Sequence, residues 1–111
     1  MQVVNVKVAH IRPMYNNLKE WVENDDNYYI GRIGIVFVDG SRYPPNDSPF
    51  ANPYKEGKDG TRAQIILKYE KYIKLKIKNE EVNLDDLRGK TLGCWCTPLP
   101  CHGDVLLRLL R

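Results

Sequence analysis

The chain has 111 residues, of which 42% are hydrophobic and 28% charged, which fits one globular domain over residues 1–111 and excludes a multidomain enzyme or a disordered tail. Its 17 lysine and arginine residues exceed its 14 aspartate and glutamate residues, and the resulting charge of +3 permits an anionic ligand without by itself indicating nucleic acid. No apolar stretch approaches the roughly 18 residues of a membrane span, and the N-terminal MQVVNVKVAH lacks the pattern of a signal peptide, so we expect no membrane partner.

The N-terminal part is predicted to hold two strands with a helix between them. Residues 2–8 alternate valines with polar residues, which is typical of a half-buried strand. Residues 14–24 carry apolar side chains at helical spacing and predict a short amphipathic helix. Residues 34–39 form a continuous apolar run of strand-forming residues, which favours a buried strand.

A proline-rich loop and a long helix follow. Residues 40–60 are rich in proline and glycine, and the aromatic side chains with the Asn52-Pro53 step favour an ordered, packed loop. Thr61 is expected to cap a helix, because apolar residues recur after it with a period of about 3.6. These residues are Ile65, Ile66, Tyr69, Tyr72, Ile73 and Ile77. We interpret the lysine-rich opposite face as a solvated surface.

The C-terminal part predicts a short turn or helix that ends at Gly89, a strand at 90–95 and a closing helix at 103–110. The whole order is then β-α-β-loop-α-β-α. It indicates a small single-domain α/β fold with a partly parallel sheet and flanking helices, compatible with a Rossmann-like topology.

The three cysteines are clustered at Cys94, Cys96 and Cys101, and the residues before them contain none. A secreted, disulfide-stabilised domain would spread an even number of cysteines along the chain, so we expect reduced thiols and a cytoplasmic location. The cluster leaves three interpretations open: metal ligands, reactive or ligand-binding thiols, or small buried apolar side chains.

The predicted elements place this cluster where a strand ends and a helix begins. Ligands of open α/β sheets bind outside the carboxyl ends of the strands, which makes Cys94 and Cys96 candidate ligand-binding residues. The helix N-terminus stabilises thiolates and anions, so Cys101, His102 and Asp104 are candidate catalytic residues. Asp104 has an alternative assignment as a helix cap.

Arginines elsewhere in the chain are candidates to complete an anion site. Arg32 follows Gly31 just before a predicted strand, and Arg62 lies in the first turn of the long helix, where a cation opposes the helix dipole. The planar guanidinium group suits phosphate. Asn52, in the loop, is the third candidate ligand-binding residue outside the cysteine cluster.

A metal site is the alternative use of the cysteine cluster. Cys94, Cys96, Cys101 and His102 could supply three thiolates and an imidazole to zinc, or three thiolates to an iron–sulfur cluster. The spacing argues against both cofactors. The chain has no C-x2-C pair, the prolines between Cys96 and Cys101 restrict how far the chain can bend to bring the cysteines together, and adjacent residues such as Cys101 and His102 rarely bind one ion.

Three motifs carry a resemblance to a known family. They are Asn52-Pro53-Tyr54, the segment GKDGTR at 57–62, and the block GCWCTPLPCHGDVL at 93–106. The chain thereby resembles the domain-of-unknown-function family 4326, found in bacteria, phages and large DNA viruses, which has no settled activity. The chain departs from the family pattern at Tyr54, where phenylalanine is usual, and in extra residues over about 33–48. The resemblance implies a Rossmann-like domain that handles nucleotides or nucleobases.

We therefore carry three functional hypotheses. In the first, a Cys/His/Arg site binds or processes a small anionic ligand, a phosphate-bearing nucleotide or nucleoside, as an enzyme or a sensor. The second is a metal-containing module that binds nucleic acid or protein, supported by the lysine-rich helix face. The third is a structural or interaction domain, such as a viral adaptor acting in the host cytoplasm.

Overall fold

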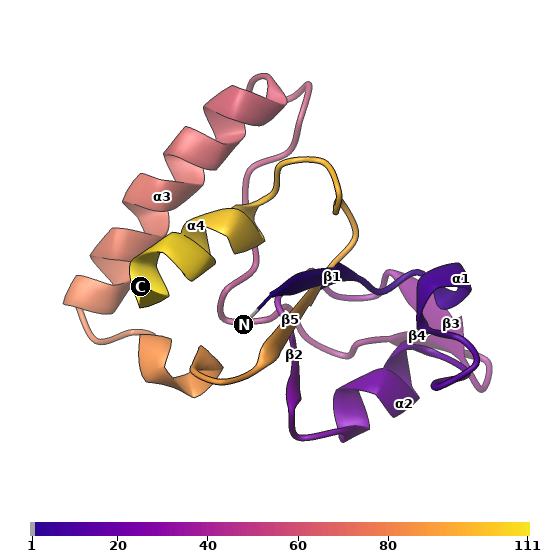
Figure 1. The fold of residues 1–111 in the computed structure, drawn as a ribbon. Coiled ribbons are helices and arrows are strands. Elements are labelled where there is room, and N and C mark those ends of the chain that lie inside the picture. Colours follow the sequence, from indigo (N-terminus) through magenta and orange to yellow (C-terminus); the bar gives the residue numbers. More distant parts are fainter. Residues whose placement is uncertain (1) are drawn as a thin grey trace.

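A parallel three-stranded sheet lies at the centre of the computed structural model, which describes residues 2–111 (Figure 1). The sheet consists, in spatial order, of β1 (Val3–Asn5), β5 (Thr91–Cys94) and β2 (Asn27–Tyr29). Val4 lies opposite Gly93 in one pair and Tyr28 opposite Leu92 in the other, and both pairs are parallel. The expected α/β class with a partly parallel sheet is confirmed. The strand order differs from the Rossmann order, because the last strand separates the first two.

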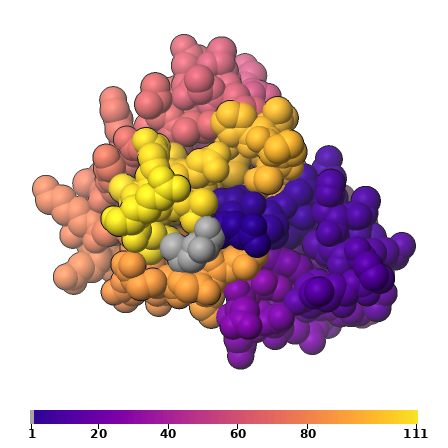
Figure 2. Space-filling view, viewed as in Figure 1, coloured from indigo at the N-terminus to yellow at the C-terminus, as the bar shows by residue number. Residues whose placement is uncertain are grey.

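Helices cover both faces of this sheet. They are α1 (Val8–Ile11), α2 (Leu18–Glu23), α3 (Arg62–Lys78), the 3-10 helix η1 (Leu84–Leu87) and α4 (His102–Leu110). In Figure 1, α3 and α4 lie on one side of the strands, with α1 and α2 on the other. Figure 2 shows α4, in yellow, packed beside the indigo N-terminal segment. No helix within the described residues has both the length and the apolar character needed to cross a lipid bilayer.

The central strand β5 serves two hydrophobic cores. Leu92 and Cys94 belong to the core that α3 and α4 close, together with Tyr69 and Leu106. On the other face, a Cβ atom at Gly93 would lie only 2.5 Å from the Trp21 ring. Glycine at this position therefore lets α2 pack directly on the sheet. The second core consists of Val6, Ile11, Leu18, Trp21 and Tyr29.

The first predicted strand is shorter than the alternating pattern suggests. It ends at Asn5, whose Oδ1 accepts a hydrogen bond from the Lys7 backbone N–H at 2.9 Å. This local contact turns the chain, and Val8 then begins α1 and is exposed instead of facing the core. The strand prediction over residues 2–8 is therefore wrong in its second half.

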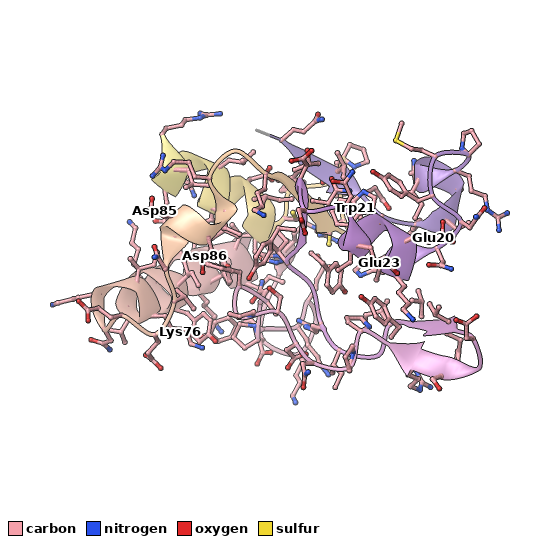
Figure 3. All side chains as sticks on the ribbon, turned by 90° about the horizontal axis from the view of Figure 1, so that it is seen from below. Glu20, Trp21, Glu23, Lys76, Asp85 and Asp86 are labelled. Atoms are coloured by element: carbon pink, nitrogen blue, oxygen red, sulfur yellow. The ribbon has the colours of Figure 1, made fainter. Side chains whose placement is uncertain are left out.

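The first predicted helix also starts later than expected. Residues 14–24 were expected to be helical, whereas α2 begins at Leu18 because Asn17 caps it by accepting from the Glu20 N–H at 2.9 Å. Met14 lies before this cap and its side chain is 79% exposed. In Figure 3, Trp21 and Glu20 can be followed on α2; Trp21 is buried and Glu20 is exposed.

The buried strand expected at 34–39 is wrong. The segment instead forms β3 (Val36–Val38), which pairs antiparallel with β4 (Ser41–Tyr43) in a hairpin apart from the central sheet. Asp39 and Gly40 connect the two strands with positive φ angles of 52° and 81°, the conformation of a tight hairpin turn. Phe37 is 67% exposed, whereas the neighbouring Val36 is partly buried against the second core. The hairpin lies within residues 33–48, the segment expected to be extra (Figure 1).

Beyond the hairpin, the loop is ordered and packed as expected. Phe50 is fully buried in the larger core, and its carbonyl oxygen accepts a hydrogen bond from the Tyr69 hydroxyl at 2.6 Å. This bond ties the middle of the loop to α3. The loop is also held next to the carboxyl end of β2, because the Ser48 N–H donates to the Gly31 carbonyl oxygen at 3.0 Å.

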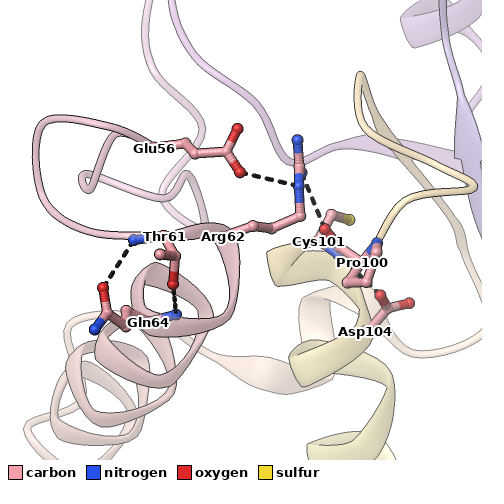
Figure 4. Close-up of polar contacts among 7 residues, drawn as sticks. All are labelled: Glu56, Thr61, Arg62, Gln64, Pro100, Cys101 and Asp104. Atoms are coloured by element: carbon pink, nitrogen blue, oxygen red, sulfur yellow. Dashed lines mark hydrogen bonds and ion pairs between the residues drawn. The ribbon is translucent and has the colours of Figure 1, made fainter.

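Helix α3 confirms the sequence prediction most closely. Thr61 is its N-cap, and Thr61 and Gln64 form a reciprocal capping box, with both bonds drawn in Figure 4. Ile65, Tyr69 and Ile73 of the predicted apolar stripe are buried. The strand at 90–95, the turn before Gly89 and the C-terminal helix are also present, as β5, η1 and α4.

Candidate functional site

A cleft of about 360 Å³ lies at the carboxyl ends of β2 and β5. The residues that follow these strands form its inner wall, and the loop and the start of α3 form the opposite side. The lining residues are Gly31, Arg32, Ile35, Asn52, Tyr54, Lys55, Glu56, Arg62, Ile65, Cys94, Trp95, Cys96 and His102. The position is that of ligand sites in open parallel sheets, and the volume is that of a small-molecule site.

Six of the eight residues singled out in the sequence line this one cleft. They are Arg32, Asn52, Arg62, Cys94, Cys96 and His102, and they come from segments that are far apart in the chain. Cys101 and Asp104 do not line it. These residues converge because β2 and β5 are parallel, so both strands end at the same edge of the sheet.

Arg32 holds the loop in place at the mouth of the cleft. Its Nε donates to the carbonyl oxygen of Asn52 at 3.0 Å, and its Nη2 donates to that of Tyr54 at 2.7 Å. Gly31 precedes it because a Cβ atom there would collide with the Tyr29 ring. These two bonds use only part of the guanidinium group, which leaves further N–H donors for a ligand.

Arg62 stands on the opposite side, in the first turn of α3 (Figure 4). Its Nε lies 3.2 Å from a Glu56 carboxylate oxygen, and its Nη1 donates to the Pro100 carbonyl at 3.1 Å. A hydrogen bond with the Cys96 side chain, followed by the nearby Glu56 charge, raises the pKa of Arg62. Arg62 thus joins α3 to the loop that precedes α4. Its role explains a cation at a position that the helix dipole disfavours.

Asn52 is a buried polar side chain, 8% exposed, between the loop and the cleft. Its Oδ1 accepts a hydrogen bond from the Tyr54 backbone N–H at 2.9 Å, which fixes the turn of the Asn-Pro-Tyr motif. Within residues 2–111, its Nδ2 group makes no hydrogen bond, and this group is therefore available as a donor at the cleft.

Cys94 and Cys101 form a buried thiol pair, with 3.1 Å between their Sγ atoms. The hydrogen bond from Cys101 is the largest influence on Cys94, and with a further bond to the Thr97 side chain it lowers the pKa of Cys94. The same shared proton, with burial, raises the pKa of Cys101. The two thiols therefore titrate as a coupled pair, in which the contact between the sulfurs favours loss of the first proton and opposes loss of the second.

Cys101 and Asp104 are engaged in capping α4. The Cys101 Sγ accepts from the Gly103 N–H at 3.2 Å, and an Asp104 carboxylate oxygen accepts from the Cys101 N–H at 3.0 Å. The structure thus gives Asp104 the capping geometry that the sequence left as one of two alternatives, and it sets Cys101 behind Cys94. Of this pair, Cys94 is the residue that lines the cleft.

His102 is the first helical residue of α4 and lines the cleft. Its Nε2 lies 2.7 Å from the Ile30 carbonyl oxygen and must donate to it, which leaves Nδ1 as the nitrogen able to accept a proton. Burial lowers the pKa of His102, and the nearby Arg32 charge adds to this effect. The imidazole is therefore neutral at pH 7. Its ring packs edge to face against the Tyr69 ring, with 5.0 Å between the centroids, and this contact holds the plane of the imidazole.

The four candidate metal ligands do not converge. Among residues 2–111, no three side chains of histidine, cysteine, aspartate or glutamate are placed to hold one ion. Cys96 contacts Arg62, while His102 uses Nε2 on a backbone carbonyl. The donor set of the described residues is thus divided between separate contacts.

Sequence reasoning missed part of the cleft. Trp95 lines it and donates through Nε1 to the Tyr29 hydroxyl at 2.8 Å, and that hydroxyl donates to the Arg32 carbonyl at 3.0 Å. This chain of bonds links the residue after β5 to Tyr29 of β2 and to the Arg32 backbone. Strand alternation gave no signal for Trp95, because it would place Trp95 on the side opposite to Cys94 and Cys96.

Comparisons with known proteins give a family and uncharacterised relatives. A family model described as "Domain of unknown function (DUF4326)" matches residues 15–111. The chain is 41% identical over 59 residues to the "Uncharacterized 12.4 kDa protein in nrdA-td intergenic region" of Enterobacteria phage T4, a match that covers 50% of this chain and 55% of that protein. It is 33% identical over 104 residues to "Uncharacterized protein R718" of Acanthamoeba polyphaga mimivirus, covering 86% and 74% respectively. The match thus spans about half the length of the phage relative. No solved structure matches the chain.

Proposed function

The chain belongs to the DUF4326 family, and from the geometry of the cleft we propose that it binds a small phosphate-bearing nucleotide or nucleoside there. The observation that carries the proposal is the convergence of Arg32, Arg62 and Asn52 with neutral His102 at the carboxyl ends of two parallel strands. Such an edge is where open α/β sheets bind their ligands. The resemblance noted in the sequence supports the same class of ligand.

The phosphate group would lie between Arg32 and Arg62. With Lys55, these side chains supply three cations to the cleft lining, against the single carboxylate of Glu56. The side chain of Glu56 is 50% exposed, so it can leave Arg62 when a phosphate oxygen takes its place. Guanidinium groups bind phosphate in a bidentate manner, and charge-assisted bonds of this kind are the strong ones.

The rest of the cleft suits a base or a sugar. Tyr54 and Trp95 give aromatic surface, and the Asn52 Nδ2 is a donor with no partner inside the described protein. His102 can accept a proton at Nδ1, and Cys94, whose pKa the hydrogen bond with Cys101 lowers, lines the same cleft. These two groups are the ones through which the protein would process a bound ligand, with Cys101 acting through Cys94 and Asp104 through the helix cap.

Calorimetric titration with ribonucleoside monophosphates, the matching nucleosides and inorganic phosphate tests the proposal. We expect at least one monophosphate to bind more tightly than its nucleoside. We expect Arg62→Ala to weaken binding about tenfold or more, since a hydrogen bond to a charged group contributes about 1.5–3 kcal/mol. Arg12→Ala is the matched control, because Arg12 is exposed and lines none of the cleft.

Two results would contradict the proposal. One is that no monophosphate in the panel produces heat or raises the melting temperature. The other is that Arg62→Ala and Arg12→Ala weaken binding equally, which would indicate a non-specific response to the loss of positive charge. Zinc or iron found in stoichiometric amount in protein purified without oxygen would instead favour the metal-containing module.

A further inference from the structure

A second cavity adjoins the cleft. Its volume is about 760 Å³, and it shares four lining residues with the cleft: Arg32, Ile35, Asn52 and Lys55. The two cavities therefore meet along the Arg32 side chain and the loop that Arg32 holds. Together they form one groove that runs between the base of the hairpin and α3. The groove is larger than a single nucleotide requires.

The far wall of the second cavity comes from α3. Tyr72 and Lys76 line it, and the Lys76 ammonium lies 5.0 Å from the centroid of the Tyr72 ring. Figure 3 shows Lys76 on α3, well away from the α2 residues labelled in the same view. A hydrogen bond with the Tyr72 side chain raises the pKa of Lys76, so this cation is fully charged at neutral pH.

Positive charge and aromatic rings continue from one cavity into the other. Tyr54 lines the cleft and Tyr72 lines the second cavity, and their rings meet edge to face with 6.1 Å between centroids. The cations of the joined groove are Arg32, Lys55, Arg62 and Lys76. The anions are Asp47, whose Oδ1 accepts from the Ile33 N–H at 2.7 Å, and Glu56.

We propose that the second cavity takes a second phosphate-bearing nucleoside unit, so that the ligand of this protein is a linked dinucleotide unit and not a mononucleotide. This inference rests on the proposed function of the cleft. A cationic groove with successive aromatic rings is how proteins follow a nucleotide chain without reading its sequence. Arg32, at the junction, would face the linking phosphate, with Arg62 and Lys76 at the two ends.

The test compares ligands of increasing length on the wild-type protein. Calorimetric titration would use nucleoside monophosphates, free dinucleotides with a phosphodiester or a diphosphate link, and single-stranded oligonucleotides. We expect a dinucleotide to bind at least tenfold more tightly than its component monophosphate. A free dinucleotide as the natural source predicts no further gain with longer strands, whereas a nucleic-acid strand predicts that affinity keeps increasing.

Substitutions at the far end separate this inference from the function of the cleft. We expect Lys76→Gln to reduce dinucleotide affinity several-fold and to leave monophosphate affinity unchanged. Lys71→Gln, an exposed lysine of the same helix that lines neither cavity, is the control for charge and folding. Arg62→Ala should weaken both kinds of ligand.

The outcomes that overturn the inference differ from those that overturn the proposed function. Equal affinity for monophosphate and dinucleotide, or a Lys76→Gln variant with unchanged dinucleotide affinity, would overturn the second cavity as a nucleotide site while leaving the cleft intact. Binding of no nucleotide of any length would overturn both.

Discussion

The two walls of the groove are built in opposite ways. The inner wall, residues 94–104, contains the buried Cys94, Cys101 and Gly103 and is crossed by hydrogen bonds, including the thiol pair and the α4 cap, while its loop at 98–100 is exposed. The outer wall begins with the hairpin over 33–48, whose contacts are mostly internal: Gly34 donates to the Pro44 carbonyl at 2.9 Å, and Arg42 lies 4.8 Å from the Phe37 ring centroid. The inner wall thus belongs to the larger core through Cys94 and Cys101, whereas the hairpin packs on the smaller core through the partly buried Val36 and Tyr43.

This contrast predicts its largest effect at β5, the strand that leads into the inner wall. Gly93→Val would force a side chain into the Trp21 ring, and overpacking of this kind costs about 3 kcal/mol in the free energy of unfolding. Urea denaturation followed by tryptophan fluorescence measures the loss. An unchanged denaturation midpoint would mean that α2 can move away from the sheet, and the inner wall would then be less constrained than we infer.

A smaller effect is expected where the loop joins the inner core. Tyr69→Phe removes the hydroxyl that donates to the Phe50 carbonyl and leaves that buried oxygen without its partner, at a cost of about 2 kcal/mol. The same denaturation experiment measures it. If the variant matches the wild type, water reaches the Phe50 carbonyl, and the loop is less tightly packed than its burial indicates.

The thiol pair predicts a pH dependence that the hairpin lacks. The pKa of Cys94 is lowered to about 6 in the folded protein, so the folded state releases this proton before an unfolded thiol does. Stability should therefore rise as pH increases from about 6 toward the ordinary thiol pKa of about 8.5. Above that value it should fall again, because Cys101 keeps its proton when folded and loses it when unfolded.

Denaturation midpoints measured across this pH range, in the wild type and in Cys101→Ala, check the effect. The variant lacks the S–H donor, so its rise between pH 6 and pH 8.5 should be smaller than that of the wild type. Parallel pH profiles for the two proteins would show that Cys101 does not stabilise a Cys94 thiolate.

The smallest effect is expected at the hairpin. Phe37→Ser exchanges an exposed ring for a polar side chain, and surface changes away from the core usually alter stability by no more than about 0.5 kcal/mol. Denaturation of this variant beside Gly93→Val gives the contrast directly. A loss comparable to that of Gly93→Val would place the hairpin within the cooperative core and remove the distinction between the walls.

The same contrast explains which elements were predictable from the sequence. Helix α3 is predictable from the capping residues Thr61 and Gln64 and from a long apolar stripe, because many residues share one helical period. Strand β2 has only three residues, Asn27–Tyr29, too few for any alternation to be recognised, and it exists because β5 offers it a partner. At the hairpin, Asp39-Gly40 was a local turn signal, but the apolar run beside it pointed to burial.

The sequence predicted which residues line the candidate site better than it predicted what each residue does there. Arg32, Asn52 and Arg62 were identified by residue type and by position next to strands or helix starts, and they converge because the sheet is parallel. The division of labour between Cys94 and Cys101 was not predictable. It depends on the extended N-cap conformation of Cys101, which turns its sulfur toward the start of α4, and on the strand end, which brings Cys94 to the cleft lining.

The tight turn at Asp39 and Gly40 has a practical consequence. Both residues are exposed and stand at the tip of the hairpin, between the paired strands β3 and β4. A short peptide tag or a fluorophore attachment site inserted between them would report on the protein from a point outside both cavities. Surface immobilisation through this tip would orient the molecules with the groove unblocked, which suits single-molecule measurement of ligand residence.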